Sequence, residues 1–266
     1  MENEPAIRLA AFISIFAVMA AYELWSPRLE RTEMQGAMKS KRWFTNLSMV
    51  VLSSVCLRII FPAAAVGTAL YAVSQGWGLF NVFGVGPVIA GIVAFIILDF
   101  AVWLEHVVSH KWPLLWRIHR MHHADQGFDL TTALRFHPLE IVLSMLWKAT
   151  IIIALGAPAI AVLIFEIVLN GMAMFNHANA RIPRPVDRVL RWLVVTPDMH
   201  RVHHSAVHRE TDSNYGFNFS FWDRLFATYV DQPQAGHDKM TIGLNDYQGP
   251  KTANLFWTLA LPFRPK

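Results

Sequence analysis

The sequence contains a single cysteine, Cys56, among 266 residues. One thiol excludes disulfides within the chain, zinc sites built from several cysteines, and iron–sulfur clusters held by cysteine thiolates. Charged residues are also scarce, at 16% against about 25% in ordinary soluble domains. Hydrophobic residues reach 54% of the chain, which excludes intrinsic disorder and favours a membrane protein.

Five apolar runs have the composition of membrane-spanning helices, for which about 20 residues suffice. The second run contains Arg58 and Pro62, so it predicts either one tilted span or a span followed by an interfacial piece. The break at Gly156-Ala157-Pro158 predicts a tight turn, and the acidic leader MENEPAIR disfavours a cleaved signal peptide. The runs cover residues 6–25, 44–73, 79–104, 139–155 and 159–176.

These runs predict an all-α, multi-pass membrane bundle of four or five spans. Five Lys and Arg residues lie in the loop 27–43, whereas the connection 74–80 carries no charge. Counting five spans from an outside N-terminus places every Lys/Arg-bearing loop on the cytoplasmic side. The expected organisation is a single integral-membrane domain, 1–266. Its parts are N-terminal spans (1–105), a cytoplasmic His-rich segment (106–138), a helical hairpin (139–176) and a cytoplasmic helical cap (177–266).

The net charge of +4 is explained by the positive residues that multi-pass proteins carry on cytoplasmic loops. No separate soluble domain is evident that would hold a basic patch, so we expect no nucleic-acid partner. Within the cap, the stretches 188–195 and 253–263 are apolar but too short to span, and we expect them to lie in the membrane interface.

Histidine is the unusual residue type, with twelve copies. Eight of them fall into one HxxxH pattern and two HxxHH patterns. Side chains at i, i+3 and i+4 share one helical face, so each pattern aims several imidazoles at one point. Imidazole suits iron, zinc and copper. The patterns comprise His106 and His110; His119, His122 and His123; and His200, His203 and His204.

Three groups of two or three nitrogens exceed what one ion accepts, so the patterns favour a site with two metal ions. Two further candidates, His137 and His177, stand beside predicted span ends, which brings the set to ten ligands. We expect His208 and His237, which lie outside the patterns, to be interfacial or hydrogen-bonded residues rather than ligands.

Other metal chemistries lack their residues in this sequence. The HExxH pattern of metalloproteases is absent. The paired Glu-x-x-His of carboxylate-bridged di-iron bundles is absent as well. A haem-bearing bundle would place isolated histidines deep within the spans, whereas these histidines lie at the span ends.

The stretches EHVVSH, HRMHHADQGFDLTTALRFHP, FNHAN and HRVHHSAVHRETDSNYGFNFSFWDRLFATY resemble the fatty acid hydroxylase superfamily, also called the sterol desaturase family. They cover about residues 100–230. The segment DLTTALR is most similar to bacterial sterol-desaturase-like and alkylglycerol-monooxygenase-like members. The resemblance implies a membrane-bound di-iron oxygenase that uses O₂ and external electrons to hydroxylate or desaturate a C–H bond of a lipid.

By the same resemblance, the family's metal positions fall on nine histidines, and His137 joins them through an R-x-HP element. Glu105 is either a partner of a ligand histidine or a plain interfacial residue. Asp212, Asn214 and Tyr215 belong to a family signature with a structural role. Zinc is expected only as an artefactual substitute for iron. The nine positions are His106, His110, His119, His122, His123, His177, His200, His203 and His204.

Electrons must come from a partner, because the chain has no cysteine cluster, cytochrome domain or nucleotide-binding glycine motif. We expect cytochrome b5, a ferredoxin or a flavin reductase to dock on the cytoplasmic face. Two readings of the basic residues Arg181, Arg184, Arg188 and Arg191 stay open, namely attraction of an acidic donor and ordinary positive-inside charge.

The expected location is a bacterial inner membrane or the endoplasmic reticulum. Two alternative functions are a non-enzymatic membrane metal-handling protein and a zinc-dependent membrane hydrolase. The first would need ligands along a path across the membrane, and the second would need neither O₂ nor an electron donor.

Overall fold

The computed structural model describes residues 3–30 and 33–265, and within these ranges every regular element is a helix. Five helices are long and apolar enough to cross a membrane. The predicted all-α membrane bundle is therefore confirmed, with the larger of the two span counts. The five are α1 (Glu4–Trp25), α2 (Glu33–Ile60), α5 (Pro87–Lys111), α7 (Pro138–Leu155) and α8 (Ala159–Asn176).

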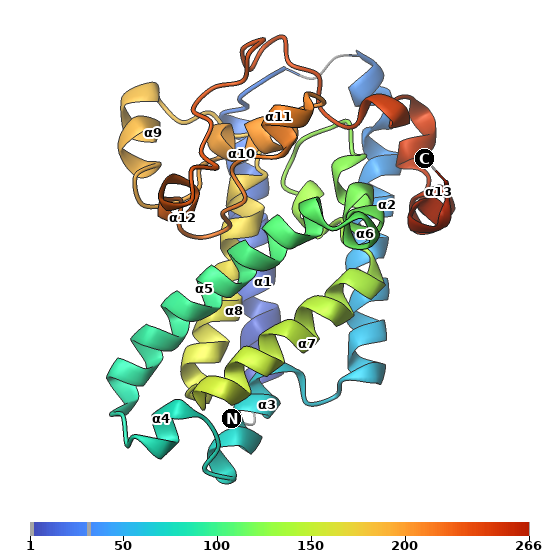
Figure 1. Ribbon diagram of the computed structural model, residues 1–266. Helices are drawn as coiled ribbons and strands as arrows, with labels where there is room; N and C mark the ends of the chain where they lie inside the picture. Colours follow the sequence, from blue (N-terminus) through green and yellow to red (C-terminus); the bar gives the residue numbers. More distant parts are fainter. Residues whose placement is uncertain (1–2, 31–32, 266) are drawn as a thin grey trace.

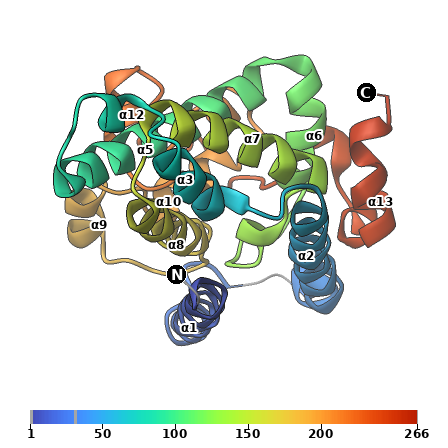
Figure 2. The ribbon, with the colours of Figure 1, turned by 90° about the horizontal axis from the view of Figure 1, so that it is seen from below.

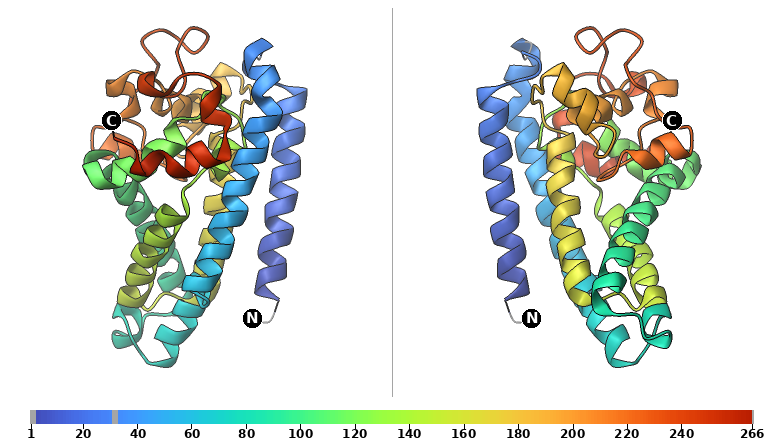
Figure 3. Two further views of the ribbon diagram at one scale, coloured as in Figure 1. Left: turned by 90° about the vertical axis from the view of Figure 1, so that its right-hand side faces the viewer. Right: turned by 90° about the vertical axis from the view of Figure 1, so that its left-hand side faces the viewer.

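Successive spans alternate in direction, so the long polar connections gather at one end of the bundle. Figures 1 and 3 show α1, α5 and α8 rising toward the cap, and α2 and α7 descending from it. In the view from below, α1 stands at the edge of the bundle, where it packs against α8 (Figure 2). The segments that carry the histidine patterns therefore lie at the same end.

The second apolar run forms two helices. Helix α2 ends at Ile60, and the proline at position 62 precedes α3 (Ala64–Ser74). Small side chains of α3, at Ala65 and Ala69, are fully buried where the helix packs against α7 and α8. A short helix, α4 (Leu79–Val82), then leads into α5. The piece after the second span, α3, therefore belongs to the packed core at the end of the bundle away from the cap.

The turn between α7 and α8 has the tight geometry that its sequence predicts. Gly156 has φ +66°, in the left-handed region that favours glycine. A Cβ at this position would lie 2.3 Å from Nδ2 of Asn81 and 2.4 Å from the carbonyl oxygen of Trp77. Glycine is required both by the backbone angle and by the close approach of the chain around α4.

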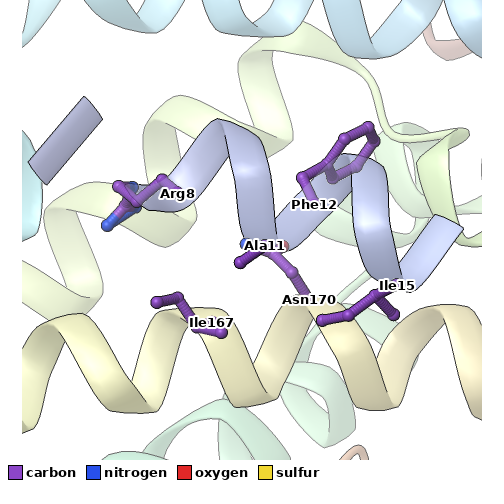
Figure 4. A pocket seen from close by; sticks show the side chains of 6 residues that line it. All are labelled: Arg8, Ala11, Phe12, Ile15, Ile167 and Asn170. Atoms are coloured by element: carbon purple, nitrogen blue, oxygen red, sulfur yellow. The ribbon is translucent and has the colours of Figure 1, made fainter. Parts of the chain in front are cut away.

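Charged side chains within the spans pair with one another. Arg8 of α1 lies 2.5 Å from Glu166 of α8, whose other oxygen lies 3.0 Å from Nζ of Lys148 on α7. Charges at membrane depth are costly unless paired, and this network ties three spans together. Arg8 also lines a small cavity of about 20 Å³ between α1 and α8, with Phe12 and Asn170 nearby (Figure 4).

The cap consists of short helices joined by loops. Its apolar stretches expected at the membrane interface expose large side chains, among them Trp192 at 67% and Phe256 at 79%. The cap elements are α6 (Pro113–His123), η1 (Thr132–Leu134), α9 (Arg184–Leu190), α10 (Pro197–His203), α11 (His208–Thr211), α12 (Phe221–Leu225), η2 (Asn245–Tyr247), η3 (Pro250–Ala253), α13 (Leu255–Ala260) and η4 (Leu261–Phe263).

The end of α1 is fastened to the cap by a buried carboxylate. Glu23, 7% exposed, accepts hydrogen bonds from the backbone N–H groups of Leu130 and Asn179, each at 2.7 Å. These groups belong to the loop after α6 and to the segment after α8. The acidic residue near the end of the first span therefore positions two segments beside the histidines.

Candidate metal centre

The structure brings nine buried histidines together in two groups, each compact enough to hold one metal ion. The facing ligand atoms within each group lie within 4.8 Å of one another. The two groups adjoin, since the rings of His123 and His204 stack with centroids 4.6 Å apart. The first group is His106, His110, His119, His123 and His203, and the second is His122, His177, His200 and His204.

Each HxxHH motif contributes to both groups. Residues four apart on a helix differ by about 40° in direction, whereas the residue at i+3 points about 100° away from its i+4 neighbour. On α6, His119 and His123 therefore face the first group and His122 faces the second. The second motif divides in the reverse sense, since His200 and His204 face the second group and His203 the first.

The hydrogen bonds of the outer ring nitrogens fix which nitrogens face inward. Nδ1 of His106 lies 2.7 Å from the carbonyl oxygen of Tyr215, and Nδ1 of His203 lies 2.6 Å from that of Ser213. Nδ1 of His177 likewise lies 2.8 Å from a backbone carbonyl oxygen. A carbonyl oxygen only accepts, so each Nδ1 carries the proton and each Nε2 presents a lone pair to its group.

The inward nitrogens fit a cation better than they fit one another. Nε2 of His106 lies 3.2 Å from Nε2 of His119, whose Nδ1 donates to the carboxylate of Glu140 at 2.6 Å. Two lone pairs at this separation repel. Nitrogens bound about 2.1 Å from one ion are themselves about 3.0 to 3.4 Å apart, so the residues present fit metal ions. In the second group, the His177–His122 and His200–His177 pairs of Nε2 atoms lie 3.1 and 3.2 Å apart.

The cap histidines are held in the neutral form that binds metals. Burial lowers the pKa of His177 to about 4 and of His203 to about 3. Burial, followed by the charges of neighbouring imidazoles, also lowers the pKa of His122, His200 and His204 well below the usual value. At neutral pH these rings are unprotonated and their lone pairs are available to a metal.

A buried aspartate shapes the loop whose carbonyl groups orient the histidines. Asp223 of α12 accepts hydrogen bonds from the backbone N–H groups of Tyr215 and Gly216, each at 2.9 Å, and from Nε1 of Trp103 at 3.0 Å. Asn214 has φ +51°, and its side chain bonds to the backbone of Val230. The segment that contains Tyr215 and Ser213 therefore supports the outer sides of the His106 and His203 rings. The role of Asp223 in holding this segment was not predicted from residue spacing.

Two buried arginines hold the segment after α6. Arg42 of α2 contacts Asp125 at 2.6 Å and Asp129 at 3.1 Å. Arg135 donates to the carbonyl oxygen of Met121 at 3.0 Å and to Oδ1 of Asn46 at 3.0 Å. Proximity to Arg42 holds the pKa of Asp125 below its usual range despite burial, so this carboxylate is charged. These contacts fix the C-terminal end of the helix that carries three ligand candidates.

Two carboxylates approach clustered histidines, and the nearer is Glu140 on α7, 2.6 Å from Nδ1 of His119. Glu105 instead accepts a hydrogen bond from Ser144 at 3.0 Å. A second acid, Asp212, lies 3.4 Å from Nδ1 of His110 and 2.7 Å from Lys111. No spacing pattern relates Glu140 to His119, because 21 residues separate them and only the packing of α6 against α7 brings them together.

Three histidines lie outside both groups. His137 caps the start of α7, where its Nδ1 accepts from the backbone N–H of Leu139 at 3.1 Å. The side chain of His208 is 92% exposed, and buried His237 lies 3.8 Å from Asp198. Nine of the ten ligand candidates are thus brought together, and His137 is not.

Of the four arginines considered for attraction of an acidic electron donor, Arg191 is not available. Arg191 is 4% exposed and pairs with Asp187 and with Asp231 at 3.0 Å. A buried guanidinium with two acidic partners offers no charge to an incoming protein. The remaining members, Arg181, Arg184 and Arg188, are exposed.

The fold and the site together define a polytopic helical membrane protein with a double histidine centre at one end of its bundle. The family model described as fatty acid hydroxylase matches residues 91–228, slightly more than half of the chain. The chain belongs to the fatty acid hydroxylase family. The matched region contains every member of both histidine groups.

Individual relatives agree at modest identity. The chain is 28% identical over 176 residues to ornithine lipid hydroxylase OlsE of Rhizobium tropici, covering 66% of this chain and 50% of the relative. Alkylglycerol monooxygenase of Xenopus tropicalis is 27% identical over 157 residues, or 59% and 34% of the two chains. A cholesterol 25-hydroxylase-like protein of Danio rerio is 27% identical over 136 residues, which cover 50% of this chain and 52% of the relative.

The chain spans about half the length of these relatives or less. No solved structure matches the chain.

Proposed function

We propose that this protein is a di-iron oxygenase that hydroxylates or desaturates a C–H bond of a membrane lipid. The observation that carries the proposal is the division of nine buried, inward-facing imidazoles into groups of five and four. The names of the relatives, a lipid hydroxylase and an alkylglycerol monooxygenase, support a lipid substrate and oxygen chemistry.

Two iron ions bound in these groups would supply the redox chemistry for O₂ activation, which redox-inactive zinc does not offer. The overall hydroxylation converts R–H, O₂, two electrons and two protons into R–OH and water. The chain's own residues hold the ligands. The carbonyl groups of Tyr215 and Ser213 fix the tautomers of His106 and His203, and the Glu140 carboxylate increases the basicity of His119.

The proposed orientation places the histidine end on the cytoplasmic side. Four basic residues at the start of α2 and just before it lie at that end, in accord with the positive-inside rule: Arg28, Lys39, Lys41 and Arg42. A cytochrome b5, a ferredoxin or a flavin reductase would then deliver electrons to the cap. The exposed Arg181, Arg184 and Arg188 supply positive charge for an acidic donor.

The first test is metal identity and stoichiometry in protein expressed with added iron and purified without oxygen. Elemental analysis together with Mössbauer spectroscopy should give about two coupled, nitrogen-ligated irons per chain. One zinc ion, or no tightly held metal, would contradict the proposal in favour of a hydrolase or a metal-handling protein. Expression with added iron is essential because imidazole sites also accept zinc.

A further inference from the structure

A pocket of about 350 Å³ opens beside the four-histidine group, and the metal centre does not use it. Its walls come from the segment after α1, the cap-side end of α2, the loop after α6, and the cap loop around residue 240. The cavity between α1 and α8 shown in Figure 4 is far smaller, at about 20 Å³. The larger pocket has room for a chemical group the size of a lipid headgroup.

One side chain connects the pocket with the centre. Phe128 lines the pocket, and its ring lies 5.7 Å from the ring of His177 and 5.2 Å from that of His204. The guanidinium of Arg201, another lining residue, lies 4.6 Å from the Phe128 ring. A ligand in the pocket therefore lies one aromatic ring away from the second histidine group.

Positive charge in this pocket has spare hydrogen-bonding capacity. Arg201 is 2% exposed, donates from Nη2 to Asn179 at 3.1 Å, and its Nε has no hydrogen-bond partner in the described parts of the chain. Both ring nitrogens of buried His237, another lining residue, also lack hydrogen bonds there. Arg42, by contrast, is satisfied by Asp125 and Asp129.

The remaining lining is mixed in character. Met38 of α2, Ile242 of the cap and Phe128 contribute apolar surface, whereas Gln126 and Gln248 contribute amides. Two carboxylates, Glu30 and Asp238, also line the pocket, and Asp238 is paired with Arg28 at 3.2 Å. A pocket at the end of two spans, half apolar and with an under-used buried cation, matches the boundary between a headgroup and its acyl chain. Burying a guanidinium is costly unless an anion compensates it.

We propose that this pocket binds the anionic headgroup of the lipid substrate, a phosphate or carboxylate, with Arg201 as its counter-charge. That the lipid is a substrate rests on the proposed function. Phe128 contacts both the pocket and the histidine rings. A headgroup bound in the pocket therefore brings the lipid carbons next to the headgroup, rather than the end of the acyl chain, closest to the metal centre.

Two variants test the pocket, each with a matched control. Arg201→Gln removes the cation, and Arg120→Gln is its control, because Arg120 holds the same place in the other HxxHH motif but donates to the backbone of Leu261 and to Tyr247. Thr241→Trp fills the pocket from the cap side without altering the arginine. Lys239→Trp, in the same loop, is the control outside the lining.

The probes are phosphatidic acid and diacylglycerol, each labelled at the chain end, and unlabelled inorganic phosphate as competitor. Purified protein should bind phosphatidic acid at least about tenfold more tightly than diacylglycerol, since diacylglycerol has no charged group to accept hydrogen bonds from Arg201. We expect Arg201→Gln and Thr241→Trp to lose this preference and both controls to keep it.

Equal wild-type affinity for the two lipids would overturn the proposal, as would a preference that survives Thr241→Trp. Inorganic phosphate that competes as well as the lipid would reassign the pocket to a soluble anion. If Arg201→Gln fails to fold, the lipid preference of the Thr241→Trp variant tests the proposal by itself. Iron content, measured on the same samples, reports on the proposed function separately, because lipid selectivity in an iron-free protein would leave the pocket assignment standing.

Discussion

The carboxylate of Glu140 lies 2.6 Å from Nδ1 of His119, so an acid on a membrane span orients a ring of the metal centre. We expect Glu140→Gln to weaken iron binding by about 10- to 100-fold, the usual cost of losing such a partner. Iron affinity is measured by competition with a chromophoric chelator. Glu105→Gln is the control, because Glu105 bonds to Ser144 instead. Equal affinities for the two variants would show that the Glu140 contact does not tune the site.

Single histidine substitutions should separate ligands from bystanders. His122→Ala and His203→Ala each remove a ring from one group, and we expect both proteins to lose bound iron. His208→Ala should retain it, because that side chain is 92% exposed. Elemental analysis of the three proteins, purified in parallel, gives the answer. The same iron content in all three would refute the ligand assignment.

Asp223→Asn should destabilise the loop behind the histidines. The carboxylate accepts from two backbone N–H groups and from Trp103, and an amide group cannot accept at both of its atoms. We expect a loss of roughly 1.5 to 3 kcal/mol in the free energy of unfolding. Denaturant titration of the protein in detergent measures this loss. The exposed Asp246, changed to Asn, is the control. An unchanged midpoint for Asp223→Asn would remove this residue from the support of the site.

Metal-free protein should lose stability as the pH falls below the ordinary histidine pKa of about 6.5. Burial lowers the pKa of His177 to about 4 and of His203 to about 3, so between these values and 6.5 the unfolded chain binds protons that the folded chain does not. The stabilising contribution is therefore complete above pH 6.5 and decreases through pH 4. Thermal unfolding of the apo-protein between pH 7.5 and 4.5 measures it, and a melting temperature independent of pH would contradict the expectation.

Glu166→Gln should destabilise the spans, because it leaves Lys148 and Arg8 without their shared partner. Removing one member of a buried pair costs about 3 to 5 kcal/mol, and the partly exposed Arg8 places this case at the lower end. The double variant Lys148→Met/Glu166→Gln should recover part of the loss. Unfolding in sodium dodecyl sulfate measures both. Strictly additive effects would mean that the pair does not interact.

The sequence alone predicts those features that depend on local periodicity. The spans at 139–155 and 159–176 agree with α7 and α8 to within one residue, because apolar length and the Gly156 turn are local properties. The histidine patterns predict two ions because three groups of two or three nitrogens exceed what one ion accepts. The structure differs in one respect, since each HxxHH motif divides its rings between the two groups instead of aiming all of them at one point.

Features that depend on packing between distant segments could not be predicted in this way. Glu140 reaches His119 only because α7 packs against α6. Arg191 looks like a surface charge in sequence, yet it is buried against Asp187. The apolar run after Ile60 breaks into α3, whose small residues fit against α7 and α8. Each outcome depends on which surfaces meet, and the composition of one segment does not specify that.

Helix α5 runs without interruption from Pro87 to Lys111 and carries His106 and His110 on its last turns. Two members of the first histidine group thus lie on a continuous membrane-spanning helix. A helix accommodates a bilayer of different thickness in part by tilting, and a change in the tilt of α5 would move both rings relative to those on α6 and α10. We therefore expect the geometry of the centre to depend on membrane thickness, which makes lipid chain length a variable to control whenever its chemistry is measured.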